Sequence, residues 1–160
     1  MPNTSSPFTG IEGVDSSGAG AYIKPGKHLL EVGKTFFKQG FKGPVFIAEC
    51  DVIESNVHPV GQRVSFVAKL NPADKVRNDL GLGNIKGFVA AALAEDEKKI
   101  GEIHVNAVVD GTNRLAGTRL KCIAVEVPTQ KVGGVFTKCN WEYASGGLVE
   151  AQRAAAKPAG

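Results

Sequence analysis

The sequence predicts a mainly β fold with a helical insert. Five runs alternate apolar and polar residues with the two-residue period of a half-buried strand. Between the third and the fourth run, apolar residues instead recur three and four positions apart, which is the period of a helix. A chain of 160 residues with 42% hydrophobic and 22% charged residues has the ordinary size and composition of one globular domain.

The predicted strands cover residues 27–37, 45–53, 62–70, 118–127 and 135–143. In the first strand, Leu30, Val32 and Phe36 share one face. Lys34 falls on that same face, so we expect an imperfect register or a bulge at Gly33.

The second and third strands alternate more regularly. Phe46 and Cys50 lie on one face of the second strand, whereas Glu49 and Asp51 lie on the other. Phe66 has the parity of a core residue in the third strand, the most regular of the five. Both patterns are typical of strands with one face on the core and one face toward solvent.

The helical insert follows the third strand. Its stripe of apolar residues consists of Ile85, Phe88, Val89, Ala92 and Leu93. Asn84 is the expected N-cap of this helix, and the charged residues 95–99 are expected to form its solvated end. Residues 102–109 fit either a short helix or a strand, and we favour the helix.

This order of elements is that of a five-stranded Greek-key barrel of the OB type, with the helix between strands three and four. The strands alone would also fit an SH3-like barrel or part of a sandwich, and the helical insert favours the OB type. The domain is expected to span residues 21–144. Residues 1–20 and 145–160 are rich in small and polar residues and are expected to be flexible.

Positive charge concentrates near two predicted loops, 38–43 and 128–134. The formal net charge of the whole chain is only +3. Residues 24–42 contain five lysines and one glutamate, a net charge of +4, and residues 118–138 contain four cations and one glutamate, a net charge of +3. In an OB-type barrel these loops flank the usual ligand-binding face, so a polyanionic ligand is indicated.

Aromatic residues accompany these cations, a combination that suits single-stranded nucleic acid because lysines meet phosphates and rings stack on bases. The candidate nucleic-acid-binding residues are Lys34, Phe37, Lys38, Phe41, Lys42, Arg63, Lys69, Arg119, Lys121, Lys131, Lys138, Trp141 and Tyr143. Phe41 either stacks on bases or caps the barrel, and Trp141 and Tyr143 either stack or face the interior. We expect Phe36 and Phe46 in the core.

No catalytic, metal or cofactor site is predicted. Cys50, Cys122 and Cys139 lie in strands without a CxxC pair, which suggests buried thiols in a reducing compartment. The three histidines lack metal-binding spacing, and the run GLGNIKG matches no phosphate-binding loop. The chain shows no signal-peptide pattern and no apolar run of membrane-spanning length. A non-enzymatic protein without membrane contact is therefore expected.

Several runs carry a resemblance to a known group. They are GKHLLEVGKTFFKQGFKGPVFIAECDVIES, GQRVSFVAKL, LGNIKGFVAAAL and LAGTRLKCIAVEV. Over residues 26–143 the chain resembles small phage proteins of the OB-fold type that bind single-stranded DNA and are encoded with replication and recombination genes. The resemblance implies sequence-tolerant DNA binding in the cytoplasm of the host cell, with phage replication or recombination proteins as partners and a homo-oligomer as a further possibility.

The tail departs from that pattern. Many single-stranded DNA-binding proteins recruit partners through an acidic C-terminal tip, whereas here Arg153 and Lys157 follow the last acid, Glu150. The alternative function is that of a structural or virion-associated protein-interaction module with a small β-barrel.

Overall fold

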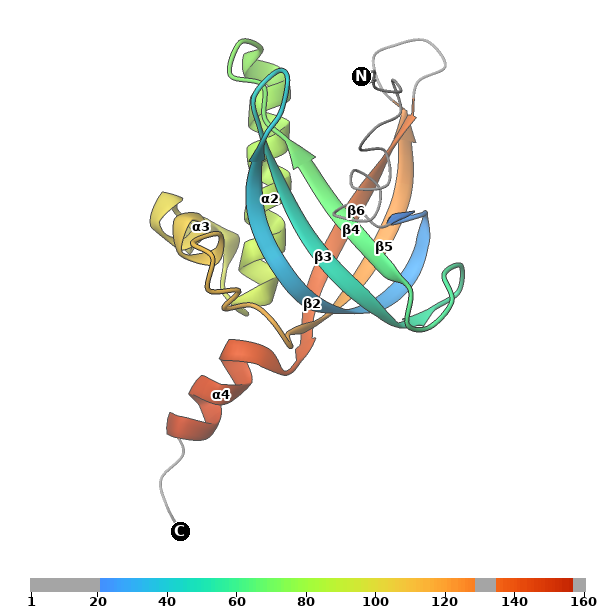
Figure 1. The fold of residues 1–160 in the computed structure, drawn as a ribbon, viewed down its shortest axis with the longest axis vertical. Helices are drawn as coiled ribbons and strands as arrows, with labels where there is room; N and C mark the ends of the chain where they lie inside the picture. Colours follow the sequence, from blue (N-terminus) through green and yellow to red (C-terminus); the bar gives the residue numbers. More distant parts are fainter. Residues whose placement is uncertain (1–20, 129–134, 157–160) are drawn as a thin grey trace, which may run out of the picture.

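The protein is mainly β, with one six-stranded sheet and several helices (Figure 1). The computed structural model describes residues 21–128 and 135–156. The strands are β1 (Ala21–Tyr22), β2 (Gly26–Gln39), β3 (Pro44–Ser55), β4 (Arg63–Lys69), β5 (Arg119–Pro128) and β6 (Val135–Ser145). The helices are α2 (Lys75–Ala92), the 3₁₀ turn η2 (Glu97–Lys99), α3 (Glu102–Val108) and α4 (Gly147–Ala156).

The strand order is β1-β4-β3-β2-β5-β6. The long strand β2 pairs with β3 along its length and with β5 through residues 26–31, so it links the two halves of the sheet. The sheet curls strongly: three strands separate β4 from β6, yet the ring of Trp141 on β6 lies 5.2 Å from that of Phe66 on β4. As predicted, the main helix lies between the third and fourth of the five long strands.

The expected bulge in the first long strand is confirmed. The register of β2 against β3 shifts between Val32 and Thr35, which moves every later side chain to the opposite face. Thr35 therefore points inward and donates a hydrogen bond of 2.7 Å to the carbonyl oxygen of Val108. The prediction that Phe36 joins the core is wrong, because Phe36 is only half-buried and lies outside the core cluster. The shift places Phe37 on the side of Phe46, with the two rings 5.7 Å apart, but Phe37 remains 37% exposed at the edge of the core.

The core is built on an aromatic cluster between the sheet and α2. Phe46, Phe66 and Phe88 contact one another with centroid separations of 5.3–6.2 Å. Trp141 completes the cluster at 4.9 Å from Phe88. The predicted apolar stripe of the helix supplies Phe88 and its buried neighbours. Burial of these apolar side chains stabilises the packing of α2 against the sheet.

The helix begins earlier than the sequence predicts. Its N-cap is Asp74, whose carboxylate accepts a hydrogen bond from the Arg77 amide, rather than Asn84. The run of glycines that suggests a helix entry lies inside α2. At Gly81 a Cβ would collide with the carbonyl oxygen of Lys69, so the glycine permits the helix to approach β4 closely.

The segments after the main helix differ in how well they were predicted. Residues 102–108 form α3, as favoured. Residues 147–156 form α4, where the sequence predicts a flexible tail. Arg153 of α4 lies 5.4 Å from the centre of the Tyr143 ring, and the Tyr143 hydroxyl donates to the Gly146 carbonyl at 2.9 Å. The expected flexible segment 1–20 lies outside the described residues. None of the described helices combines the length and hydropathy needed to cross a bilayer.

Candidate nucleic-acid interface

The loop between β2 and β3 presents Phe41 at its tip, and this side chain is fully exposed. The base of the loop is fixed in two ways. The Gly40 amide donates to the Gly43 carbonyl at 2.9 Å, and the Leu70 amide donates to the Pro44 carbonyl at 2.9 Å. Phe41 is therefore an aromatic ring in solvent on an anchored hairpin, with no part in the core.

Four exposed lysines lie on this hairpin or on the neighbouring strand β4. The register places Lys38 beside Val45, and Val45 beside Lys69, so two of the lysines follow one row across three strands. Lys34 lies in the bulge of β2, and Lys42 follows Phe41 in the loop. We call Lys34, Lys38, Lys42 and Lys69 the hairpin lysines. Within the described part of the chain, no carboxylate lies at ion-pair distance from any of them, so their charge is available to an anion.

The two predicted arginines do not join the hairpin lysines. Arg63 lies 3.4 Å from a carboxylate oxygen of Asp51 and 3.8 Å from one of Glu49. Arg119 lies 3.1 Å from a carboxylate oxygen of Glu31. Each guanidinium group is therefore partly neutralised by a neighbouring carboxylate, and neither arginine is a strong candidate for a phosphate contact.

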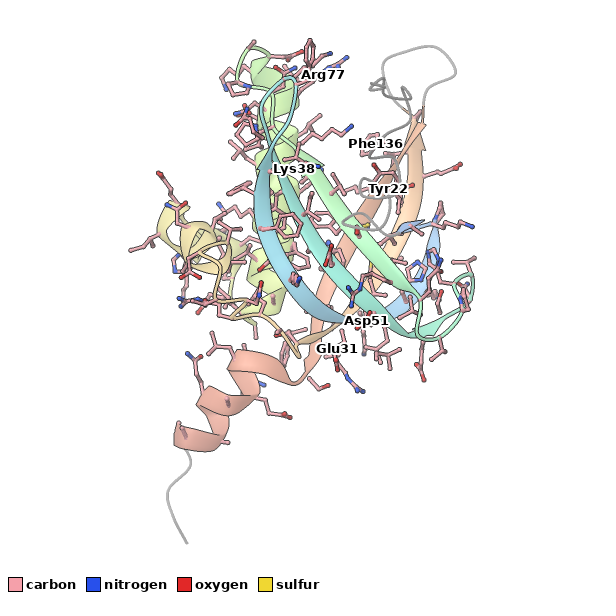
Figure 2. All side chains as sticks on the ribbon, in the orientation of Figure 1. Tyr22, Glu31, Lys38, Asp51, Arg77 and Phe136 are labelled. Carbon is pink, nitrogen blue, oxygen red and sulfur yellow. The ribbon has the colours of Figure 1, made fainter. Side chains whose placement is uncertain are left out.

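A groove runs between β4 and β6 over the first turns of α2. Its volume is about 1230 Å³. The basic residues that line it are Lys69, Arg77 and Lys138, and the exposed aromatic residues that line it are Tyr22 and Phe136. Figure 2 shows Tyr22 and Phe136 close together in projection on one side, with Arg77 near the start of α2. Asp79 and Glu97 also line the groove, and Asp79 is paired with Lys75 at 2.8 Å. Arg77 lies 3.5 Å from a carboxylate oxygen of Asp74, so Lys69 and Lys138 are the groove cations without an ion pair among the described residues.

The second predicted loop can be located only by its flanking strands. The end of β5 and the start of β6 lie at the same end of the molecule as the β2–β3 loop in Figure 1. Lys131 itself, with the rest of residues 129–134, lies outside the described residues.

Trp141 and Tyr143, the last two predicted aromatic residues, pack mainly against the interior of the protein. Trp141 packs edge-on against the stacked rings of Phe66 and Phe88, at 5.2 and 4.9 Å, and is only partly exposed. Its buried indole nitrogen has no hydrogen-bond partner among the described residues. Tyr143 is half-buried, with its hydroxyl bonded to backbone. Both fit the interior alternative that the sequence left open.

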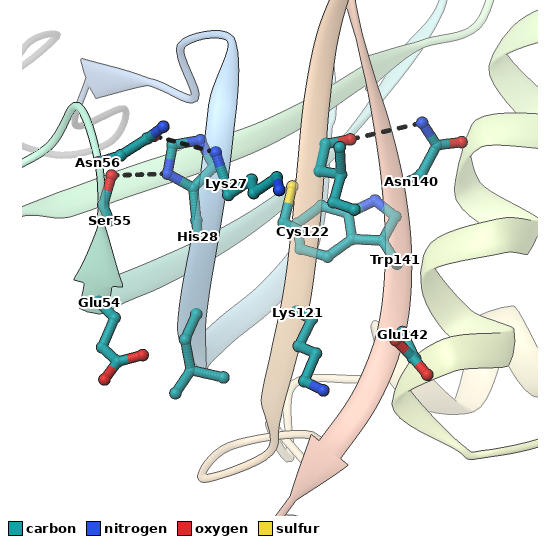
Figure 3. Close-up of a pocket in the computed structure, with 12 residues that line it drawn as sticks. Lys27, His28, Glu54, Ser55, Asn56, Lys121, Cys122, Asn140, Trp141 and Glu142 are labelled. Atoms are coloured by element: carbon teal, nitrogen blue, oxygen red, sulfur yellow. Dashed lines mark hydrogen bonds between the residues drawn. The ribbon is translucent and has the colours of Figure 1, made fainter.

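Lys121 lies apart, in a second hollow of about 640 Å³ that Figure 3 shows in close-up. This hollow also contains Lys27, Glu54 and Glu142, so two cations face two acids. Its walls are held by hydrogen bonds such as that between His28 Nδ1 and Ser55 Oγ at 2.8 Å. The balanced charge makes this hollow a poor site for a polyanion.

The thiol of Cys50 is not a candidate nucleophile. That side chain is buried, and burial raises the pKa of its thiol, so the thiolate that nucleophilic chemistry needs is disfavoured. The described residues include no cluster of three or more histidine, cysteine or acidic side chains placed to hold a metal.

Sequence reasoning missed three residues of the groove. Tyr22 precedes the first predicted strand, Phe136 was taken only as part of a strand, and Arg77 was expected in the approach to the helix. The sequence did contain a local signal, because Tyr22 and Phe136 each lie near a strand end and two residues before a lysine.

A comparison with known protein families finds no family model that matches the chain, and no curated protein matches its sequence.

Proposed function

We propose that the protein binds single-stranded DNA through the hairpin lysines and the ring of Phe41. The observation that carries this proposal is the segregation of charge. Arg63 and Arg119 are paired with carboxylates, whereas the four hairpin lysines, on or beside the hairpin that presents Phe41, have no carboxylate at ion-pair distance in the described chain. Phosphates would meet the lysines, and a base would stack on the ring.

The order of the five long strands supports an OB-type barrel. In the order β4-β3-β2-β5-β6, the first long strand has the second and fourth long strands as neighbours, and the helix follows the third. This connectivity agrees with a five-stranded Greek-key barrel whose binding face includes strands two and three and the adjoining loops. The hairpin lysines lie on the first and third long strands and in the loop between the first two.

Binding of this kind is tolerant of sequence, because every base has a face to stack and every nucleotide has a phosphate. Such a protein would coat unpaired strands during phage replication or recombination in the host cytoplasm, beside replication or recombination proteins. The resemblance over residues 26–143 supports this setting, and the geometry supports the ligand class.

The test compares two double variants by the anisotropy of a labelled oligo-dT. Lys38→Ala/Lys42→Ala removes two hairpin lysines. Lys27→Ala/Lys121→Ala removes two exposed lysines from the charge-balanced hollow and is the matched control. We expect the first pair to weaken binding and to reduce the slope of log K against log salt by about 1 to 2. Equal effects of the two pairs would contradict the proposed site, and an absence of oligo-dT binding by the wild-type protein would remove the function. In that case sedimentation into a large regular assembly without DNA would favour the structural alternative.

A further inference from the structure

The groove between β4 and β6 carries two exposed aromatic rings that the hairpin does not explain. Tyr22 is 65% exposed and Phe136 is 40% exposed. Both line the groove together with Lys69, Arg77 and Lys138. An exposed ring is unfavourable in water. The three cations of the groove outnumber its two acids, Asp79 and Glu97, so two rings beside them suggest a ligand with flat apolar faces and negative charge.

Tyr22 is exposed but its backbone is anchored. Strand β1 adds in parallel to β4, with Ala21 beside Val64 and Tyr22 beside Ser65. The next residue, Ile23, is buried in the core. A ring held by strand pairing on one side and core packing on the other loses little further freedom when a ligand stacks on it.

Two histidines clamp the chain just after this point. The Lys24 amide donates to His58 Nε2 at 3.1 Å, and the Lys24 carbonyl accepts from His28 Nε2 at 2.8 Å. The two imidazole rings lie 5.3 Å apart and are both buried. The position of Tyr22 at the groove is thus fixed by contacts of its own segment with β4, with β2 and with the β3–β4 loop.

The opposite wall is equally firm. Phe136 belongs to β6 and is paired with Val127 of β5, and Lys138 is paired with Val125. At the bottom of the groove, Phe66 and Trp141 belong to the core cluster. Lys69 lines the groove and is also one of the hairpin lysines, so a strand bound at the hairpin has a cation to follow into the groove.

The two parts of this surface recognise different features of a nucleic acid. Lysines attract the phosphates of single strands and of duplexes alike. Aromatic rings need exposed base faces, which an unpaired strand offers and a duplex hides in its stack. Discrimination between the two forms must therefore come from the rings.

We infer that Tyr22 and Phe136 form a second base-stacking site, in the groove between β4 and β6, and that this site and Phe41 together give the protein its preference for single strands over duplex. The inference rests on the proposed function. It assigns the attraction to the hairpin lysines and the selectivity to Phe41 and the two rings of the groove.

The experiment measures the affinity of the full chain for labelled oligo-dT and for a duplex of equal length. We expect Tyr22→Ala and Phe136→Ala each to weaken oligo-dT binding by about fivefold or more, with duplex binding changed by less than about twofold. The double variant should lose more of the preference for oligo-dT over duplex than either single variant, and the remaining preference should come from Phe41. Tyr22→Phe keeps the ring and should retain wild-type selectivity. Ile103→Ala truncates an exposed apolar residue of α3 and is the control.

The fluorescence of Trp141, the only tryptophan of the chain, gives a second readout at the bottom of the groove. Oligo-dT should change this emission in the wild-type protein, and the double variant at saturating oligo-dT should lose most of the change. Wild-type selectivity in a folded double variant would overturn the inference while leaving the proposed function in place. If the wild-type protein does not bind oligo-dT, both fail together.

Discussion

Substitution of Gly81 and of Gly83 in α2 by alanine should change the stability of the protein in opposite directions. At Gly81, an added methyl group would collide with the Lys69 carbonyl oxygen and would lie 2.9 Å from Leu70 Cδ2. At Gly83, nothing lies within 4 Å of an added Cβ. Both positions are helical, so both substitutions to alanine gain the same helix propensity of about 1 kcal/mol.

The difference between the two sites is therefore one of packing. The obstacle at Gly81 is the backbone of a strand in a sheet, which cannot rotate away as a side chain can, so the cost should lie near the upper end of the usual overpacking range of about 1–3 kcal/mol. We expect Gly81→Ala to lower the free energy of unfolding by about 2 kcal/mol. Gly83→Ala should raise it by about 0.5–1 kcal/mol.

Urea denaturation followed by the emission of Trp141 measures both values, because this residue lies in the core cluster between β4 and α2. Equal stabilisation by the two substitutions would show that α2 does not approach β4 closely. Since β4 also carries Lys69, a displaced helix would further alter one wall of the groove.

Three further predictions concern binding, the core and pH. Phe41→Ala should weaken oligo-dT binding by about 1–3 kcal/mol and change the unfolding free energy by less than about 0.5 kcal/mol; a lower melting temperature with intact binding would show that the ring packs rather than stacks. Phe66→Ala should destabilise the fold by about 3–5 kcal/mol in the same urea assay, and a cost below about 1 kcal/mol would contradict the core assignment. Burial lowers the pKa of His28 from its ordinary value of 6.5, with a smaller contribution from His58 in the same direction and an opposing one from its bond to the Lys24 backbone. The folded state then binds fewer protons than the unfolded state, so stability should be complete above pH 6.5 and fall as the pH drops from there toward the lowered pKa; His28→Gln should flatten this part of the profile, and an unchanged slope would refute the assignment.

The strands and the main helix were predictable because each leaves a local period. Alternation at residues such as Phe46 and Phe66 reports which face is buried, and the spacing of Ile85 and Phe88 reports a helix. The bulge at Gly33 was visible as a lysine on the wrong face. Its consequence for Phe36 and Phe37 was not, because the sequence does not say how many residues a bulge adds.

The start of α2 was missed because glycine normally weakens a helix. The reason for Gly81 is a contact with β4 that only the packed structure contains. The ion pairs of the two arginines were not predictable for a similar reason. Glu31, the partner of Arg119, lies 88 residues away in the chain, and no local pattern connects two such positions.

The candidate site was predicted in part. The lysines near the first hairpin and Phe41 were found from composition, since charge and aromatic residues cluster there in the sequence. The groove was not, because it joins β1, β4 and β6, which are brought together only when the sheet curls. Tyr22 in particular gives no sign of its position before the pairing of β1 with β4 is known.

The most direct test of the central claim is a salt titration of the wild-type protein with oligo-dT. With four hairpin lysines contacting phosphates, log K should fall linearly with log salt with a slope of about −3. Binding that is absent at low salt, or that does not change as salt rises, would contradict the claim that these lysines hold a single strand.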